Sequence, residues 1–155
     1  MMLKAKQMES LPCFFAQIPD PRRAQGRRHR LSTVLAIAAG ASLCGMRGYE
    51  AISDWAKSLG HNARRRFGCR WAKKCYIVPS KSIIRDVLIR VDPVDLDRAL
   101  QRWNQTYAQH DESLAIDGKT MCNAIDDQGY QTHVLSVVGH QSKNCYTQKK
   151  WGLCP

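Results

Sequence analysis

Hydrophobic residues recur at three- and four-residue intervals through the first two thirds of the chain, which predicts a series of amphipathic helices. The spacing places them at about 1–18, 32–44, 49–59, 80–91 and 94–108. The second segment is apolar on nearly all sides, which is typical of the central helix of a bundle. Ser32 or Thr33 is expected to cap this helix, and Ser80 or Ser82 is expected to cap the fourth one.

The pattern changes at residues 109–112, and the segments that follow predict β-strands. Apolar runs at 113–117 and 131–138 and a weaker segment at 144–150 are separated by turn residues. The sequence therefore predicts a mostly α protein, with a helical domain at 1–110 followed by two to three strands in residues 111–155. The second part is too short for an independent α/β core.

The first predicted strand carries a carboxylate within Leu114–Thr120. Leu114 and Ile116 are expected on one buried face, with Asp117 closing the strand and Gly118 in a sharp turn after it. An acid in that position can meet a ligand at the edge of a sheet. Asp-Gly is also a common turn pair, so the acid has an ordinary structural interpretation as well.

Two helix pairs are candidates for a helix-turn-helix. The pair within 32–59 has a short turn with glycine, but its second helix carries few side chains suited to reading bases, which favours an ordinary helical hairpin. The pair 80–91 and 94–108 has the better geometry. Its second helix carries Asp95 and Asp97 with only Arg98 and Arg102, which suits a major groove poorly.

The charge balance points to a polyanionic partner. The 155 residues contain 24 Lys and Arg against 13 Asp and Glu, a formal net charge of +11. So large a surplus on a small chain favours nucleic acid as the partner. A basic surface without a binding function is the alternative.

Two segments concentrate this charge. The loop after Pro21 holds five arginines and no acid. Because a loop is not expected to bury five guanidinium groups, they are expected to face solvent or phosphate. Residues 57–85 hold nine Lys and Arg and no acid, with three aromatic residues among them. Such a segment either grips nucleic acid or packs its rings inward while its cations stay in water. The predicted DNA-binding residues are Arg22, Arg23, Arg27, Arg28, Arg30, Arg64, Arg65, Arg66, Lys73 and Lys74.

The seven cysteines favour reduced thiols in a cytoplasmic protein, because their number is odd and no secretory signal precedes them. Cys69 and Cys75 are six residues apart with His61 upstream. Paired zinc ligands are usually about two to four residues apart, so the spacing argues against a metal knuckle. The apolar run Leu31–Met46 is too short to span a membrane and is expected to be a buried helix.

Five segments, in this order and at this spacing, resemble a known family. They are Ile18–Arg23, Leu31–Gly45, Ile52–Ala56, Pro79–Ser80 with Arg85, and Ala115–Thr120. The sequence resembles the start of a DDE-type insertion-sequence transposase of the H-repeat-associated kind, whose N-terminal helical part is called the transposase-associated domain. The resemblance covers nearly all of residues 10–150.

The resemblance implies that the predicted strands begin a ribonuclease-H-like β-meander. Enzymes of this kind hold two divalent metal ions, Mg²⁺ or Mn²⁺, on three carboxylates, and the ions activate the nucleophile and stabilise the leaving oxygen at a phosphodiester. Asp117 matches the first carboxylate, so it is the expected catalytic and metal-binding residue. The family's second Asp and its Glu would follow Pro155. One acid supplies too few oxygens for two ions, so productive metal binding and DNA strand transfer by this chain alone are not expected.

Two departures from the family pattern predict a truncated, decayed element. Met121–Asn123 stands where the family tends to carry a basic residue, and Trp151–Pro155 does not resemble the family's continuation. A frameshift or a premature stop would explain both. Asp126 and Asp127 lie in a predicted turn and are not expected to replace the missing acids.

Three functions stay open on the sequence alone. The chain is a truncated transposase without activity, a DNA-binding module or inhibitor derived from a transposase, or an unrelated small basic nucleic-acid-binding protein in which Asp117 is only a turn residue. The expected partners are DNA and, through oligomer formation, other copies of the chain or a full-length transposase. No membrane partner is expected, and the expected location is the cytoplasm.

Overall fold

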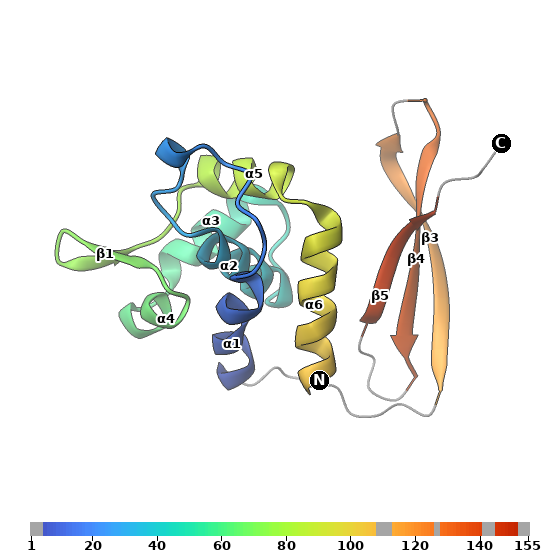
Figure 1. The fold of residues 1–155 in the computed structure, drawn as a ribbon, viewed down its shortest axis with the longest axis horizontal. Coiled ribbons are helices and arrows are strands. Elements are labelled where there is room, and N and C mark those ends of the chain that lie inside the picture. The colour runs from blue at the N-terminus through green and yellow to red at the C-terminus, as the bar shows by residue number, and fades with distance from the viewer. Residues whose placement is uncertain (1–4, 108–112, 126–127, 141–144, 152–155) are drawn as a thin grey trace. The chain divides into compact units, whose positions relative to one another are not determined.

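The computed structural model describes residues 5–107, 113–125, 128–140 and 145–151. Over these residues the chain forms six α-helices, a two-stranded hairpin and a three-stranded antiparallel sheet (Figure 1). The chain divides into two compact units, one ending at Ala99 and the other beginning at Leu100. The predicted domain boundary at residues 110–111 lies outside the described residues and stays a prediction.

The first unit is built around α2 (Leu31–Leu43), as the all-round apolar pattern predicts. Nine of its thirteen residues are buried, among them Val34, Leu35 and Ile37. Helices α1, α3 and α5 pack against α2 or against each other and bury their apolar sides (Figure 1). The other helices are α1 (Ala5–Phe15), α3 (Gly48–Ser58), α4 (His61–Arg66), α5 (Lys81–Arg90) and α6 (Pro93–Tyr107), and the division between the two units falls within α6.

The predicted cap of α2 is wrong, because Ser32 and Thr33 lie inside the helix, whereas the predicted position of the α5 cap is confirmed at Ser80. Arg30 is the N-cap of α2 and makes no side-chain cap bond, while Thr33 Oγ1 donates to the carbonyl of Gly68 at 3.0 Å. Ser80 is the N-cap of α5, but its hydroxyl lies 3.0 Å from that of Ser82 and makes no cap bond. Helix α6 is capped by Asp92, whose carboxylate accepts from two amides of its first turn.

One short helix and one hairpin were not predicted by the hydrophobic pattern. Helix α4 has six residues, and the hairpin of β1 (Arg70–Ala72) and β2 (Cys75–Ile77) has strands of three residues each. Elements this short carry too few residues for a periodic signal. The two residues between the strands are Lys73 and Lys74, whereas Asn-Gly is the usual sequence signal for such a turn.

The second unit holds the three predicted strands as an antiparallel meander, β3 (Leu114–Ile125), β4 (Gln131–Gly139) and β5 (Cys145–Trp151), in the order β3-β4-β5. The end of α6 is tied to β5 by two hydrogen bonds. Gln101 Nε2 lies 2.8 Å from Thr147 Oγ1, and Asn104 Nδ2 donates to the carbonyl of Cys145 at 2.7 Å. Asp126 and Asp127, in the predicted turn between β3 and β4, lie outside the described residues.

The expectation that Asp117 closes a buried strand is wrong. Strand β3 continues through Ile125, and Asp117 pairs with Ser136 of β4 inside the sheet. Gly118 pairs with Leu135 and does not form a turn. Leu114 and Ile116 do share a face, but they are 58% and 70% exposed, so this face of β3 is open to solvent in the described structure.

No single described helix combines the length and apolar composition of a membrane span. Helices α2 and α3 pass such a test only when taken together, across a bend of 99°.

Candidate nucleic-acid interface

Arg22, predicted to contact DNA, is instead a buried structural residue. Its side chain is only 2% exposed and forms a two-point ion pair with Asp20, with Nε and Nη2 at 2.9 and 2.8 Å from the two carboxylate oxygens. Nη1 donates to the carbonyl of Gly26 and Nη2 to that of His29. The guanidinium group thereby ties both ends of the basic loop together, and it holds the pKa of Asp20 below its usual range.

The other arginines of the loop divide into one that braces it and three that are exposed. Arg27 donates to the carbonyls of Arg22 and Asp20 at 2.8 and 3.0 Å. Within the described part of the chain, the side chains of the remaining three make no hydrogen bond or ion pair and are exposed to solvent. They are Arg23, Arg28 and Arg30. The expectation that all five guanidinium groups face solvent therefore fails at Arg22, because a paired and multiply bonded guanidinium can be buried.

The basic loop meets the hairpin at His29. The His29 side chain is buried, and its Nδ1 atom has no hydrogen-bond partner among the described residues. Burial lowers the pKa of His29, and the charges of Arg70, Arg22 and Arg28 lower it further. Arg70, in β1, therefore acts on the loop although it lies about 40 residues further along the chain, and the Thr33–Gly68 hydrogen bond holds the two segments in place.

Acidification is expected to destabilise the protein through His29. The folded protein keeps His29 neutral, whereas the unfolded chain takes up a proton near the ordinary pKa of 6.5. Stability from this residue is therefore present above pH 6.5 and falls as the pH drops towards the lower folded pKa, by at most about 1.4 kcal/mol per pH unit for one proton. Urea unfolding at pH 7.5 and pH 5.5 measures this, and His29→Phe should flatten the difference. Equal pH dependence in both proteins would contradict the assignment.

The three arginines of α4 have different environments. Arg64 is structural, because it donates to the carbonyl of Lys57 at 2.6 Å and to that of Tyr76 at 3.2 Å, joining α3 to β2. Arg66 pairs with Glu9 at 2.7 Å. Arg65 is exposed and has no such partner in the described structure.

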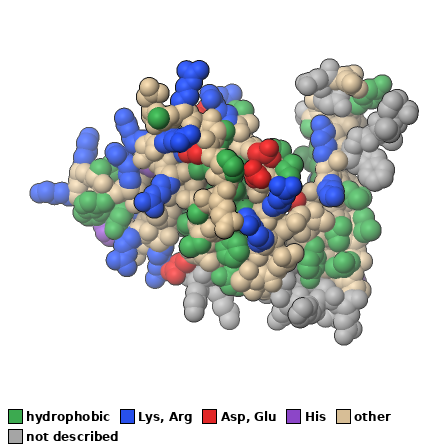
Figure 2. Space-filling view, in the orientation of Figure 1, with side chains coloured by type: hydrophobic (Ala, Val, Ile, Leu, Met, Phe, Trp, Pro, Cys, Tyr) green, Lys and Arg blue, Asp and Glu red, His purple; other side chains and the backbone are tan. Residues whose placement is uncertain are grey.

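The hairpin presents two cations at its tip. Lys73 and Lys74 both adopt positive φ angles, 49° and 61°, in the region that side-chain-bearing residues rarely enter. The cost is about 1–2 kcal/mol for each residue. Both lysines are exposed, and Figure 2 shows Lys and Arg side chains around the hairpin and across the visible face of the first unit.

An aromatic cluster supports the hairpin. Trp71 and Tyr76 face each other across the two strands with ring centroids 4.9 Å apart. His61 of α4 contacts both, at 5.6 and 4.8 Å. The sequence pattern placed these rings among cations, but it did not single out Arg70 or Trp71. A two-residue gap between two short aromatic-bearing runs was the signal that would have found the hairpin.

The helix pairs offer no comparable basic face. Glu50 and Asp54 of α3 pair with Lys81 and Lys57. Arg98 of α6 pairs with Asp95. Most charges of these helices are paired, with the exposed Arg85 of α5 as an exception, so the loop and the hairpin carry the larger group of cations without acid partners.

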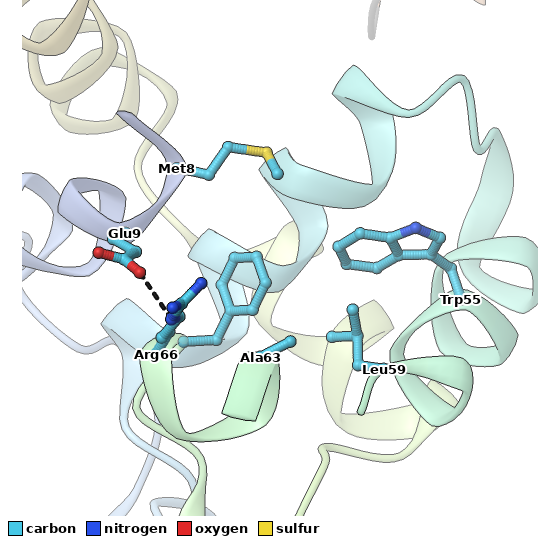
Figure 3. Close-up of a pocket in the computed structure, with 7 residues that line it drawn as sticks. Met8, Glu9, Trp55, Leu59, Ala63 and Arg66 are labelled. Carbon is cyan, nitrogen blue, oxygen red and sulfur yellow. Dashed lines mark ion pairs between the residues drawn. The ribbon is translucent and has the colours of Figure 1, made fainter. Parts of the chain in front are cut away.

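A small cavity lies among α1, α3 and α4 (Figure 3). It measures about 120 Å³ and its lining is mostly apolar, with the Glu9–Arg66 ion pair at its edge. Small-molecule sites gather several polar groups for orientation, whereas here the two charged groups satisfy each other. The lining residues are Met8, Glu9, Trp55, Leu59, Ala63, Arg66 and Phe67.

Asp117 lies in a mixed polar row of the sheet. Its cross-strand partner is Ser136, whose hydroxyl is 3.1 Å from Gln148 Nε2 on β5. Lys119 and Lys150 lie on the same face, because both are paired with Val134. Among the described residues no group of three or more His, Cys, Asp or Glu is placed to hold a metal ion. A single exposed acid with two lysines in the neighbouring row of the sheet does not fit a two-metal site.

Cys13, Cys44, Cys69 and Cys75 are free thiols, and Cys69 is buried. Burial raises the pKa of Cys69 to about 11, which makes its thiol a poor nucleophile at neutral pH. His61, which the sequence placed near a possible Cys69–Cys75 metal site, contacts aromatic rings instead.

Comparison with known proteins gives one family match. The family described as DDE_Tnp_1-associated matches residues 13–104. An "Uncharacterized protein in dhlA 3'region" from Xanthobacter autotrophicus is 32% identical over 146 residues, which are 88% of this chain and 46% of the relative. The chain thus spans about half the length of that relative. No solved structure matches.

Proposed function

Because the chain belongs to the DDE_Tnp_1-associated family, we propose that it is part of a bacterial insertion-sequence transposase of the H-repeat-associated kind, and that its helical unit binds DNA. The family description supplies the link to DDE transposases. The observation that carries the DNA-binding proposal is the basic surface shared by the loop and the hairpin. Cations without acid partners on a folded unit favour a polyanionic ligand.

The structure sorts the candidate DNA contacts by what else each side chain does. Arg22, Arg27 and Arg64 are engaged by carbonyls and Arg66 by Glu9. The exposed cations without such partners are available for phosphates, and the proposed contacts are Arg23, Arg28, Arg30, Arg65, Arg70, Lys73 and Lys74. Seven contacts of this kind would make DNA binding strongly dependent on salt.

For the second unit we propose that β3 to β5 begin a ribonuclease-H-like sheet and that Asp117 is the first of its three catalytic carboxylates. The antiparallel meander and the Asp-Gly-Lys sequence support this. In the intact family Mg²⁺ or Mn²⁺ would be held by three acids, and the described residues around Asp117 do not fit two ions. We therefore propose that this chain by itself does not catalyse strand transfer.

A second candidate function is a DNA-binding module that inhibits a related transposase. The observation in its favour is that the helical unit has its own buried core. Such a module would occupy the DNA sites of the full-length enzyme or join its oligomer.

Fluorescence anisotropy of a labelled 30-base-pair duplex, titrated with the full chain at several salt concentrations, tests the DNA-binding proposal. The triple variant Arg23→Gln/Arg28→Gln/Arg30→Gln should bind at least about tenfold more weakly and lower the salt slope by about 2–3. The matched control removes three acid-paired cations, Lys57, Arg90 and Arg98. Its affinity should stay within about twofold of wild type.

Equal losses in the two triple variants, or binding that does not respond to salt, would contradict the assigned surface. Incubation of the same proteins with Mg²⁺ or Mn²⁺ and duplex DNA should show no strand transfer. Strand transfer that disappears in Asp117→Ala would overturn the proposed inactivity.

A further inference from the structure

We propose that the β1–β2 hairpin is an arm that places Lys73 and Lys74 in the minor groove of duplex DNA. This inference rests on the DNA binding proposed above and adds the element and the groove. The hairpin projects from the helical body of its unit (Figure 1), with cations around it (Figure 2).

The turn is built in a conformation that its residues do not favour. Positive φ angles at both central positions define a turn in which Asn-Gly is the preferred pair. Two lysines occupy these positions instead, adjacent and exposed at the tip of the hairpin. Backbone strain of this kind is typical of functional positions. What the lysines provide there is two neighbouring positive charges.

The arm is held rigidly at its base. Trp71, Tyr76 and His61 form a three-ring cluster, and Arg64 donates to the carbonyl of Tyr76. Phe67 and Cys69, just before β1, are buried. The two lysines are therefore carried on a fixed support, which lowers the ordering cost of binding.

The tip of the hairpin, and not the whole ribbon, suits the minor groove. The axes of paired strands lie about 5 Å apart, so the ribbon with its side chains is wider than a minor groove of about 6 Å. The side chains of Lys73 and Lys74 at the two-residue turn are slim enough to enter it. The narrow minor groove of A/T-rich DNA also has the most negative potential, which attracts inserted lysines.

The surroundings of the arm place further cations beside it. Arg70 stands at its base, and the hydrogen bond from Thr33 to the carbonyl of Gly68 holds the segment just after the basic loop beside the segment just before β1. Arg70 and the exposed arginines of the loop are positioned for the phosphates that flank the groove. Trp71 is 56% exposed and its ring contacts with His61 and Tyr76 are edge-to-face, so stacking on single-stranded bases is the alternative that the test below distinguishes.

The test is the double variant Lys73→Asn/Lys74→Gly in the full chain. It removes both charges but installs the pair that the turn prefers, so the melting temperature should stay the same or rise. Affinity for an A/T-rich 20-base-pair duplex should fall about tenfold. The slope of log affinity against log salt concentration should become smaller by about two. The matched control Lys57→Gln/Lys81→Gln removes two lysines that are paired with acids and should stay within about twofold.

Groove choice is tested with the same wild-type complex. Distamycin, a ligand of the A/T minor groove, should displace the protein, and duplex RNA, whose minor groove is wide and shallow, should bind at least about tenfold more weakly. Equal affinity for single-stranded or RNA probes, or binding unaffected by distamycin, would overturn the inference.

The outcome also separates this inference from the proposed function. A wild-type chain that does not bind duplex DNA removes both. If the wild-type chain binds duplex DNA with an affinity that falls with salt, but the hairpin variant binds as well as its control, only the proposal of a minor-groove arm is rejected.

Discussion

Replacing Arg22 with alanine is expected to lower the free energy of unfolding by about 3 kcal/mol, because it strips a buried ion pair of one partner. The guanidinium group holds Asp20 at two points and also satisfies the carbonyls of Gly26 and His29. Arg22→Lys should recover only part of the loss, since an ammonium group lacks the planar fork that makes these contacts together. Urea unfolding followed by circular dichroism measures all three proteins.

The neighbouring arginine provides the control for this prediction. The Arg23 side chain is exposed and makes no hydrogen bond or ion pair within the described chain, so Arg23→Ala should change stability by no more than about 0.5 kcal/mol. Among folded proteins, Arg23→Ala should weaken DNA binding more than Arg22→Ala does. Equal stability of the two alanine variants would contradict the structural role given to Arg22.

The Asp20–Arg22 pair also has a pH signature. The pKa of Asp20 is lowered in the folded protein, mainly by the hydrogen bond from Arg22. Its contribution to stability is therefore present above the ordinary pKa of 3.8 and is lost as the pH falls through the folded value. In Arg22→Ala this acid-side loss should shrink, which separates the ion pair from simple loss of packing.

The helical part of the fold could be predicted because its apolar residues repeat over several turns. The buried run of α2 and the stripes of α5 and α6 each contain enough residues to fix a period. The hairpin could not be predicted in this way, since its strands have three residues each and its turn carries two lysines. Its formation depends on the rings of Trp71, Tyr76 and His61, which tertiary packing brings together.

The candidate site was predictable as a region and not residue by residue. Charge runs identified the loop and residues 57–85, but they gave Arg22 and Arg23 the same role. Which arginine is buried depends on where carbonyls and carboxylates lie in three dimensions, and composition carries no such information. Asp117 illustrates the same limit, because an Asp-Gly pair that suits a turn is here held in a continuous strand by its pairing with β4.

The support of the basic surface depends on a close contact in the core at Gly40. A Cβ atom at this position of α2 would lie 3.0 Å from Phe67 Cζ and 3.1 Å from Trp55 Cη2. Gly40→Val is therefore expected to lower the free energy of unfolding by about 2 kcal/mol through overpacking. Gly40→Ala should be close to neutral, since a gain of about 1 kcal/mol in helix propensity opposes the tighter contact.

The difference between these two variants depends on the cavity beside the rings. Trp55 and Phe67 both line a space of about 120 Å³, so each ring can shift by the few tenths of an ångström that one methyl group requires. The two further carbons of valine need a larger shift and would displace Phe67. This residue lies three positions before Arg70, where the hairpin starts.

Ala39→Val, on the partly exposed side of the same helix, controls for the helix cost of valine. If Ala39→Val and Gly40→Val are equally destabilised, the close contact has no energetic weight. If Gly40→Val alone loses both stability and DNA affinity in the folded state, the core contact positions the hairpin as well as stabilising the unit.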